Sequence, residues 1–162
     1  MIGMILVSHG RLAVEMRAAM EHVVGPQRAV ATVCIAAEDD VESKRSEIAQ
    51  AVADVDQGDG VIIFTDMFGG TPSNLAISML ERGGIEVIAG VNLPMLVKLA
   101  KTRSHHTFTE CVDCAEQAGH KYIGVASHMQ AAGISLNACR ASAESSGIRP
   151  QAAVALATPA AA

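Results

Sequence analysis

Apolar positions in this chain alternate between runs of strand length and stripes of helical spacing. The strand-length runs cover residues 4–7, 29–35, 61–65 and 85–89. Helical spacing follows the first run over residues 12–23 and the second over residues 41–55. The run at 61–65 is almost continuously apolar, so we expect helices to cover both faces of the sheet.

Cap and turn residues mark where the later helices begin and end. Thr71 fits an N-cap before a proline, and the glycines at 83–84 stop the helix that follows. Pro94 opens a further helix. Residues 107–110 have the pattern of a capping box, which predicts a last helix ending near residue 119.

The order of these elements predicts an α/β fold. Short βα connections favour a small doubly wound, mainly parallel sheet in the order 2-1-3-4, with helices on both faces. A short fifth strand is predicted at 121–125. Beyond it the hydrophobic period fades into Ala- and Ser-rich sequence, so we expect one domain over residues 1–130 and a disordered tail over 131–162.

Composition excludes several partners. The net charge of −5 and an aromatic content of 2% leave neither a basic surface nor stacking residues for nucleic acid. The apolar start, MIGMILV, is too short for a signal peptide, and no run approaches the ~20 residues of a membrane span. The expected location is the cytoplasm, without membrane insertion.

Motifs for metals and nucleotides are missing. The one CxxC, Cys111 to Cys114, has no second pair to complete a zinc site and lies in a helical pattern, where ordinary thiols are expected. The other histidines show no metal-ligand spacing, and no GxxxxGK[ST] loop cradles a nucleotide. We therefore expect no metal, no cofactor and no direct chemistry on ATP.

His9 and Asp66 are the candidate catalytic residues. In the order 2-1-3-4, the first and third strands are neighbours where the strand order reverses, and ligands bind beyond the carboxyl ends of strands at that point. His9 follows the first strand and Asp66 the third, so the two should meet. A carboxylate that accepts the proton of one ring nitrogen leaves the other nitrogen free to attack.

The loop after Asp66 predicts an anion site. Gly69 and Gly70 allow close approach of the backbone, and the first amides of the helix opening at Thr71 favour an anion. A phosphate on His9 would fit there. Taken singly, the histidine could be an ordinary loop residue and the Gly-Gly-Thr-Pro run a plain helix entry.

Three motifs carry a resemblance to a known family. They are ILVSHG at residues 5–10, FTDMFGGTPSN at 64–74 and VIAGVNLPML at 87–96. Together they resemble the mannose-family enzyme IIA domains of the bacterial sugar phosphotransferase system, over residues 2 to about 126. Thr71 stands where many relatives have Ser, and Phe68 where some have Trp.

This resemblance implies a function and partners. His9 would take a phosphoryl group from the histidine-containing phosphocarrier protein and pass it to an enzyme IIB histidine on a separate chain, for sugar uptake or a regulatory readout. Asp66 would orient the ring. A homodimer that exchanges a short antiparallel edge strand near 121–125 is also implied. The residues expected around the phosphate are Gly10, Phe68, Gly69, Gly70 and Thr71.

Two other functions remain open at this point. Residues 6–11, LVSHGR, also resemble the His-Gly turn of small tetrapyrrole metal chelatases, although that family needs a second metal-directed residue later in the chain. The same cleft could instead serve a non-catalytic sensor that binds a free anion. Which sugar is involved, if any, does not follow from the residues.

Overall fold

The computed structural model describes residues 1–131, and its sheet has four parallel strands in the order β2-β1-β3-β4. The strands are β1 (Gly3–His9), β2 (Val30–Ile35), β3 (Val61–Thr65) and β4 (Ile85–Ala89). Val7 pairs with Val33 on one side and with Thr65 on the other. The predicted fold class and strand order are confirmed, and β1 and β3 are neighbours at the reversal point.

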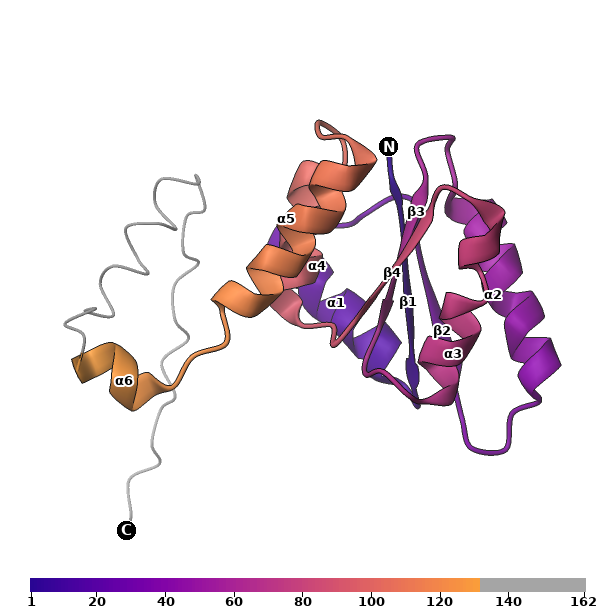
Figure 1. The fold of residues 1–162 in the computed structure, drawn as a ribbon, viewed down its shortest axis with the longest axis horizontal. Coiled ribbons are helices and arrows are strands. Elements are labelled where there is room, and N and C mark those ends of the chain that lie inside the picture. The colour runs from indigo at the N-terminus through magenta and orange to yellow at the C-terminus, as the bar shows by residue number, and fades with distance from the viewer. Residues whose placement is uncertain (132–162) are drawn as a thin grey trace, which may run out of the picture. The chain divides into compact units, whose positions relative to one another are not determined.

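Helices cover both faces of this sheet (Figure 1). On one face lie α1 (Leu12–Val24), α4 (Leu93–Thr102) and α5 (Phe108–Lys121). On the other face lie α2 (Val41–Val55) and α3 (Thr71–Ile77), and a short 3-10 turn, η1 (Leu80–Arg82), precedes β4. Among the described residues, no helix is both long and apolar enough to span a membrane.

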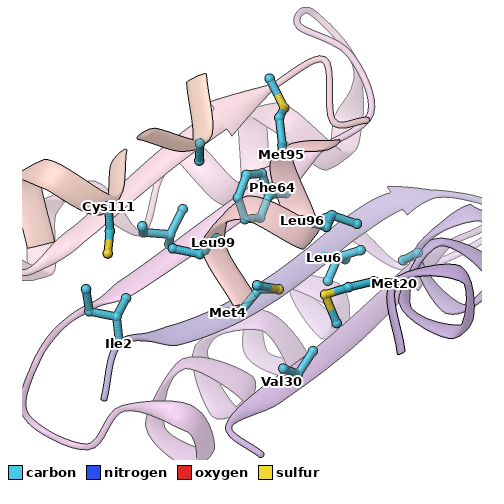
Figure 2. Packing of buried hydrophobic residues seen from close by; sticks show 13 residues of the cluster. Ile2, Met4, Leu6, Met20, Val30, Phe64, Met95, Leu96, Leu99 and Cys111 are labelled. Atoms are coloured by element: carbon cyan, nitrogen blue, oxygen red, sulfur yellow. The ribbon is translucent and has the colours of Figure 1, made fainter. Parts of the chain in front are cut away.

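Two hydrophobic cores result, one on each side of the sheet. The alternation of side chains along β1 sends Met4 and Leu6 into the core under α1, α4 and α5 (Figure 2), and Ile5 and Val7 into the core under α2 and α3. All four side chains are at most 1% exposed. Burial of β1 on both faces explains why its sequence is a continuous apolar run.

A buried arginine ties the chain together at the opposite end of the sheet from His9. Arg103 is 2% exposed, and its Nη1 donates to the carbonyls of Ile2 (3.2 Å) and Ala29 (3.1 Å). Its Nη2 donates to Gln27 Oε1 (3.0 Å) and to the carbonyl of Arg28 (2.6 Å). The burial lowers the pKa of Arg103. One guanidinium thus links the entry to β1, the entry to β2 and the end of α4.

The predicted strand at 121–125 does not form in this chain. Residue 121 ends α5, and residues 122–125 pair with no strand of the described sheet. A lone segment of this length needs a neighbouring strand to accept its backbone hydrogen bonds.

The compact unit containing the sheet is Met1–Ile123, and one further helix, α6 (Ala126–Ala131), follows it in the chain. The tail predicted over 131–162 lies, beyond residue 131, outside the described residues.

Candidate functional site

His9 is held at the carboxyl end of β1 by the residues on either side of it. The amide of Gly10 donates to the carbonyl of Ile35 at the end of β2 (2.8 Å), and Gly10 itself has a φ of +51°. Ser8 is 2% exposed, and its Oγ accepts from the amide of Ala13 in the first turn of α1 (2.6 Å). The strand end and the start of α1 are therefore fixed relative to each other.

Asp66 and His9 meet as predicted. The Oδ2 atom of Asp66 lies 2.9 Å from Nδ1 of His9 and accepts from the backbone amide of His9 at 3.0 Å. The other carboxylate oxygen, Oδ1, accepts from the amide of Met67 at 3.0 Å. The His9 side chain is 50% exposed and that of Asp66 is 13% exposed. The carboxylate is thus enclosed while the ring faces solvent.

The charge of Asp66 fixes the tautomer of the ring. Burial alone raises the pKa of Asp66, but the hydrogen bonds from the His9 amide and ring, with that from the Met67 amide, bring the pKa below its usual value. An ionised carboxylate only accepts hydrogen bonds, so Nδ1 of His9 carries the proton. Nε2 then keeps its lone pair, which makes it the available nucleophile.

Gly70 lies against the reactive edge of the ring. A Cβ atom at position 70 would lie 2.7 Å from Cε1 and 2.9 Å from Nε2 of His9. The φ of Gly70 is −99°, which any residue can adopt, so the glycine here provides space and not backbone freedom. Thr71 begins α3 directly after it, and the first amides of a helix have no acceptor within the helix.

Ser73 shapes the loop before α3, and the sequence reasoning missed it. Its buried Oγ accepts from the amide of Gly69 (3.1 Å) and donates to the carbonyl of Gly70 (3.0 Å). The amide of Gly69, one of the residues predicted to lie around the phosphate, therefore already has an acceptor. A hydroxyl residue in the first turn of a predicted helix is the signal that could have revealed this role.

A hollow of about 180 Å³ opens beside His9. Its walls include Thr71, Asp39 from the β2–α2 connection and Lys44 from α2. Phe68, predicted near the phosphate, is 67% exposed and lines a different groove along β4. Of the predicted phosphate-binding residues, the structure brings Gly70 and Thr71 to the ring of His9.

No metal cluster accompanies His9. Among the residues that the structure describes, no group of three His, Cys, Asp or Glu side chains could hold a metal ion. The end of β4, where a chelatase would need its second metal-directed group, instead leads to Asn92. That side chain accepts from the amide of Met95 (3.1 Å) and donates to the carbonyl of Gly119 (3.1 Å), so it joins α4 to α5.

Comparison with known families identifies this fold. A family model described as the PTS system fructose IIA component matches residues 3–116. The fructose-specific EIIA component of Bacillus subtilis is 28% identical over 106 residues, which cover 65% of this chain and 73% of that protein. The mannose-specific EIIAB component of Escherichia coli is 30% identical over 122 residues, 74% of this chain but 38% of that protein. The chain thus spans little more than a third of the latter.

Two solved structures of similar fold are also named as IIA proteins of the phosphotransferase system. A phosphotransferase system component EIIA from Streptococcus agalactiae superposes with a TM-score of 0.72 at 26% identity, covering 79% of this chain and 99% of that chain. The mannose/sorbose specific IIA subunit from Enterococcus faecalis gives a TM-score of 0.69 at 27% identity, covering 76% of this chain and 93% of that one.

Proposed function

Because the chain belongs to the mannose-type IIA family of the phosphotransferase system, whose members are phosphotransferases, we propose that His9 is its phosphoryl acceptor. The observation that carries the proposal is the 2.9 Å contact between Nδ1 of His9 and Asp66 Oδ2, which leaves Nε2 free at a half-exposed ring.

The geometry supports a direct transfer. The lone pair on Nε2 attacks the phosphorus of a phosphohistidine on the donor, the new N–P bond forms at His9, and the electron pair of the broken bond returns to the donor ring. The proton on Nδ1 stays there. Asp66 stabilises the positive charge that the ring develops, and this stabilisation costs no rearrangement because the carboxylate is already in place.

The proposed donor is the histidine-containing phosphocarrier protein, and the proposed acceptor is an enzyme IIB histidine on a separate chain. Both steps use the same exposed edge of the His9 ring, so the two partners would dock in turn and not together. We expect a protein that exchanges phosphoryl groups with this phosphocarrier to lie in the cytoplasm. Whether the phosphoryl group then serves sugar uptake or a regulatory readout depends on the second partner.

A reconstitution tests this function. Phosphoenolpyruvate, enzyme I and the phosphocarrier protein should label the chain once, at His9, through a bond that acid cleaves and base does not. His9→Ala should take no label. Asp66→Ala should slow labelling by roughly 10² to 10⁴ without moving the site, the usual range for losing a positioned partner in proton transfer. Label on His9→Ala, or an acyl phosphate at position 66, would refute the assignment.

We also propose that the protein is a homodimer. The outer edge of β4 pairs with no strand of the described sheet, and all five of its residues are half-buried. A groove of about 530 Å³ runs along it, lined by apolar side chains that include Val87, Val112 and Ile123. The segment near 121–125 of a second copy would fill this edge as an antiparallel strand and satisfy its backbone groups.

Sedimentation tests the dimer separately from the chemistry. At low micromolar concentration the wild-type chain should sediment as a dimer, because an exchanged strand would cover backbone donors that otherwise stay open. Val125→Pro removes one donor from the proposed strand and should weaken the dimer. A wild-type monomer at that concentration would contradict strand exchange while leaving the role of His9 intact.

A further inference from the structure

The hollow beside His9 contains one basic side chain that the proposed transfer has not used. Lys44, in the first half of α2, lines this hollow of about 180 Å³ together with His9 and Thr71. Its side chain is 20% exposed, so it lies along the wall and does not extend into solvent.

Lys44 is held in place by two carboxylates. Its Nζ lies 2.8 Å from Glu47 Oε2 on the next turn of α2 and 3.5 Å from Asp39 Oδ2. Asp39 in turn accepts from the amide of Ala36 at 2.8 Å, immediately after β2. The ammonium group is therefore positioned by the β2–α2 connection, which starts at the strand adjacent to that of His9.

Without Lys44 the hollow would carry only negative charge. A phosphoryl group brings roughly −1.5 to −2 charges. Asp66 is ionised behind the ring, and Asp39, whose pKa is lowered by the amide of Ala36, is ionised in the wall. Lys44 is the one basic side chain among the residues that line this hollow.

We propose that Lys44 compensates the charge of the phosphoryl group on His9, offsetting Asp39 in the wall of the hollow that the group enters. This inference rests on the proposed phosphorylation of His9. It assigns to the β2–α2 connection a part in the reaction beyond its structural one. Lys44 acts on the negative charge of the phosphoryl group, both as it is transferred and once it is on His9, and exchanges no bond or proton with it.

The test uses a small chemical donor as well as the protein donor. Phosphoramidate transfers its phosphoryl group to an exposed imidazole: the P–N bond of the reagent breaks, ammonia leaves, and the N–P bond forms at Nε2. The rate of phosphohistidine formation is followed by ³¹P NMR for wild type, Lys44→Met and Lys44→Arg. We expect Lys44→Met to be about fivefold to tenfold slower at low salt, and Lys44→Arg to stay within about twofold of wild type.

Matched variants separate charge from structure. Arg45→Met removes the same charge from the next residue, which is exposed and does not line the hollow, and it should react within about twofold of wild type. Asp39→Asn keeps an oxygen for the amide of Ala36 but removes the negative charge, so it should react faster than wild type. The double variant Lys44→Met with Asp39→Asn should return close to the wild-type rate.

Each outcome bears on the inference. If Asp39→Asn slowed phosphohistidine formation as much as Lys44→Met does, the two residues would only hold the β2–α2 connection in place. That result would refute charge compensation. So would a Lys44→Met rate within twofold of wild type. If phosphoramidate modifies His9 but the protein donor does not, the proposed function fails and the comparison of variants still decides the role of Lys44.

Discussion

At the scale of single residues, His9 depends on two neighbours that do different things. Asp66 fixes the tautomer of the ring through one oxygen that contacts both the ring and the backbone of His9. Gly70 leaves the space that the Nε2 edge occupies. The first effect is electrostatic and the second is steric, so substitutions can test them separately.

Gly70→Ala should impair transfer without loosening the fold. The added methyl would lie 2.7 Å from Cε1 of His9, while the backbone conformation suits an alanine, so the ring must turn away from Asp66. We expect phosphorylation to slow by about 10² while the thermal midpoint changes little.

Gly69→Ala is the matched control for this steric effect. Its φ is +85° and a Cβ atom there would meet nothing within 4 Å, so it should cost stability and spare the ring. If the two alanine variants transferred at the same rate, the steric role of Gly70 would be wrong.

The lowered pKa of Asp66 predicts a dependence of stability on pH. A carboxyl whose pKa is lower in the folded state than in the unfolded state stabilises the protein above its unfolded pKa of about 4, and the stabilisation disappears as the pH falls through the folded value. Between pH 6 and pH 3, wild type should therefore lose more free energy of unfolding than Asp66→Asn, by about 1–2 kcal/mol, as for hydrogen bonds to a charged group. Urea titrations at several pH values measure this, and parallel pH profiles would contradict it.

At the scale of elements, two buried serines connect strand ends to helix starts. Ser8 joins the end of β1 to α1, and Ser73 joins the loop after β3 to α3. Neither helix has its own side-chain N-cap, since the N-cap positions are Arg11 and Gly70. Each serine satisfies a backbone amide that would otherwise lack an acceptor, and in doing so each orients a loop of the site.

Ser8→Ala should destabilise the fold by about 1–2 kcal/mol. The substitution leaves the amide of Ala13 without its acceptor at 2.6 Å, in a place closed to water. The midpoint in urea should fall with an unchanged m-value. Ser104→Ala removes an exposed hydroxyl and should stay within about 0.5 kcal/mol of wild type. Equal stability of the two variants would show that the contact contributes nothing.

The sequence predicted the strands, their order and the meeting of His9 with Asp66, because hydrophobic period and strand-end position are local signals. The placing of Phe68 and Gly69 around the phosphate stays a prediction, while the structure shows Phe68 in a groove along β4 and the amide of Gly69 donating to Ser73 Oγ. Which way a loop side chain or amide points depends on hydrogen bonds that close only in the folded state.

The predicted strand at 121–125 shows a different limit. Apolar composition marks a segment as able to pair, but it does not tell whether the strand that receives it lies in the same chain or in a second copy. The buried role of Arg103 was not predicted for a related reason. Its four acceptors lie 74 to 101 residues away in the sequence. No periodicity within a short window carries such information.

At the scale of the whole molecule, Arg103 is the main polar link between distant parts of the chain. Arg103→Met should lower the free energy of unfolding by about 3 kcal/mol or more, because four acceptors lose a buried, charged donor. Arg103→Lys should not recover the lost stability, since a lysine ammonium lacks the planar guanidinium whose two Nη atoms donate to four acceptors here.

Thermal unfolding measures this effect, with an expected fall in Tm of about 10 °C. Arg82→Met, at an exposed arginine without an ion pair in the described residues, is the control and should unfold close to wild type. A small effect at position 103 would mean that water replaces the guanidinium.

The interior position of β1 has a consequence for how the chain acquires its fold. β1 is made before both of its neighbours in the sheet, β2 (Val30–Ile35) and β3 (Val61–Thr65). Translation must therefore pass residue 65 before the strand that carries His9 is enclosed on both sides. Pairing over such sequence separations is slow compared with helix formation. Of the four strands, the one that is made first is thus enclosed on both sides only after the third has been made.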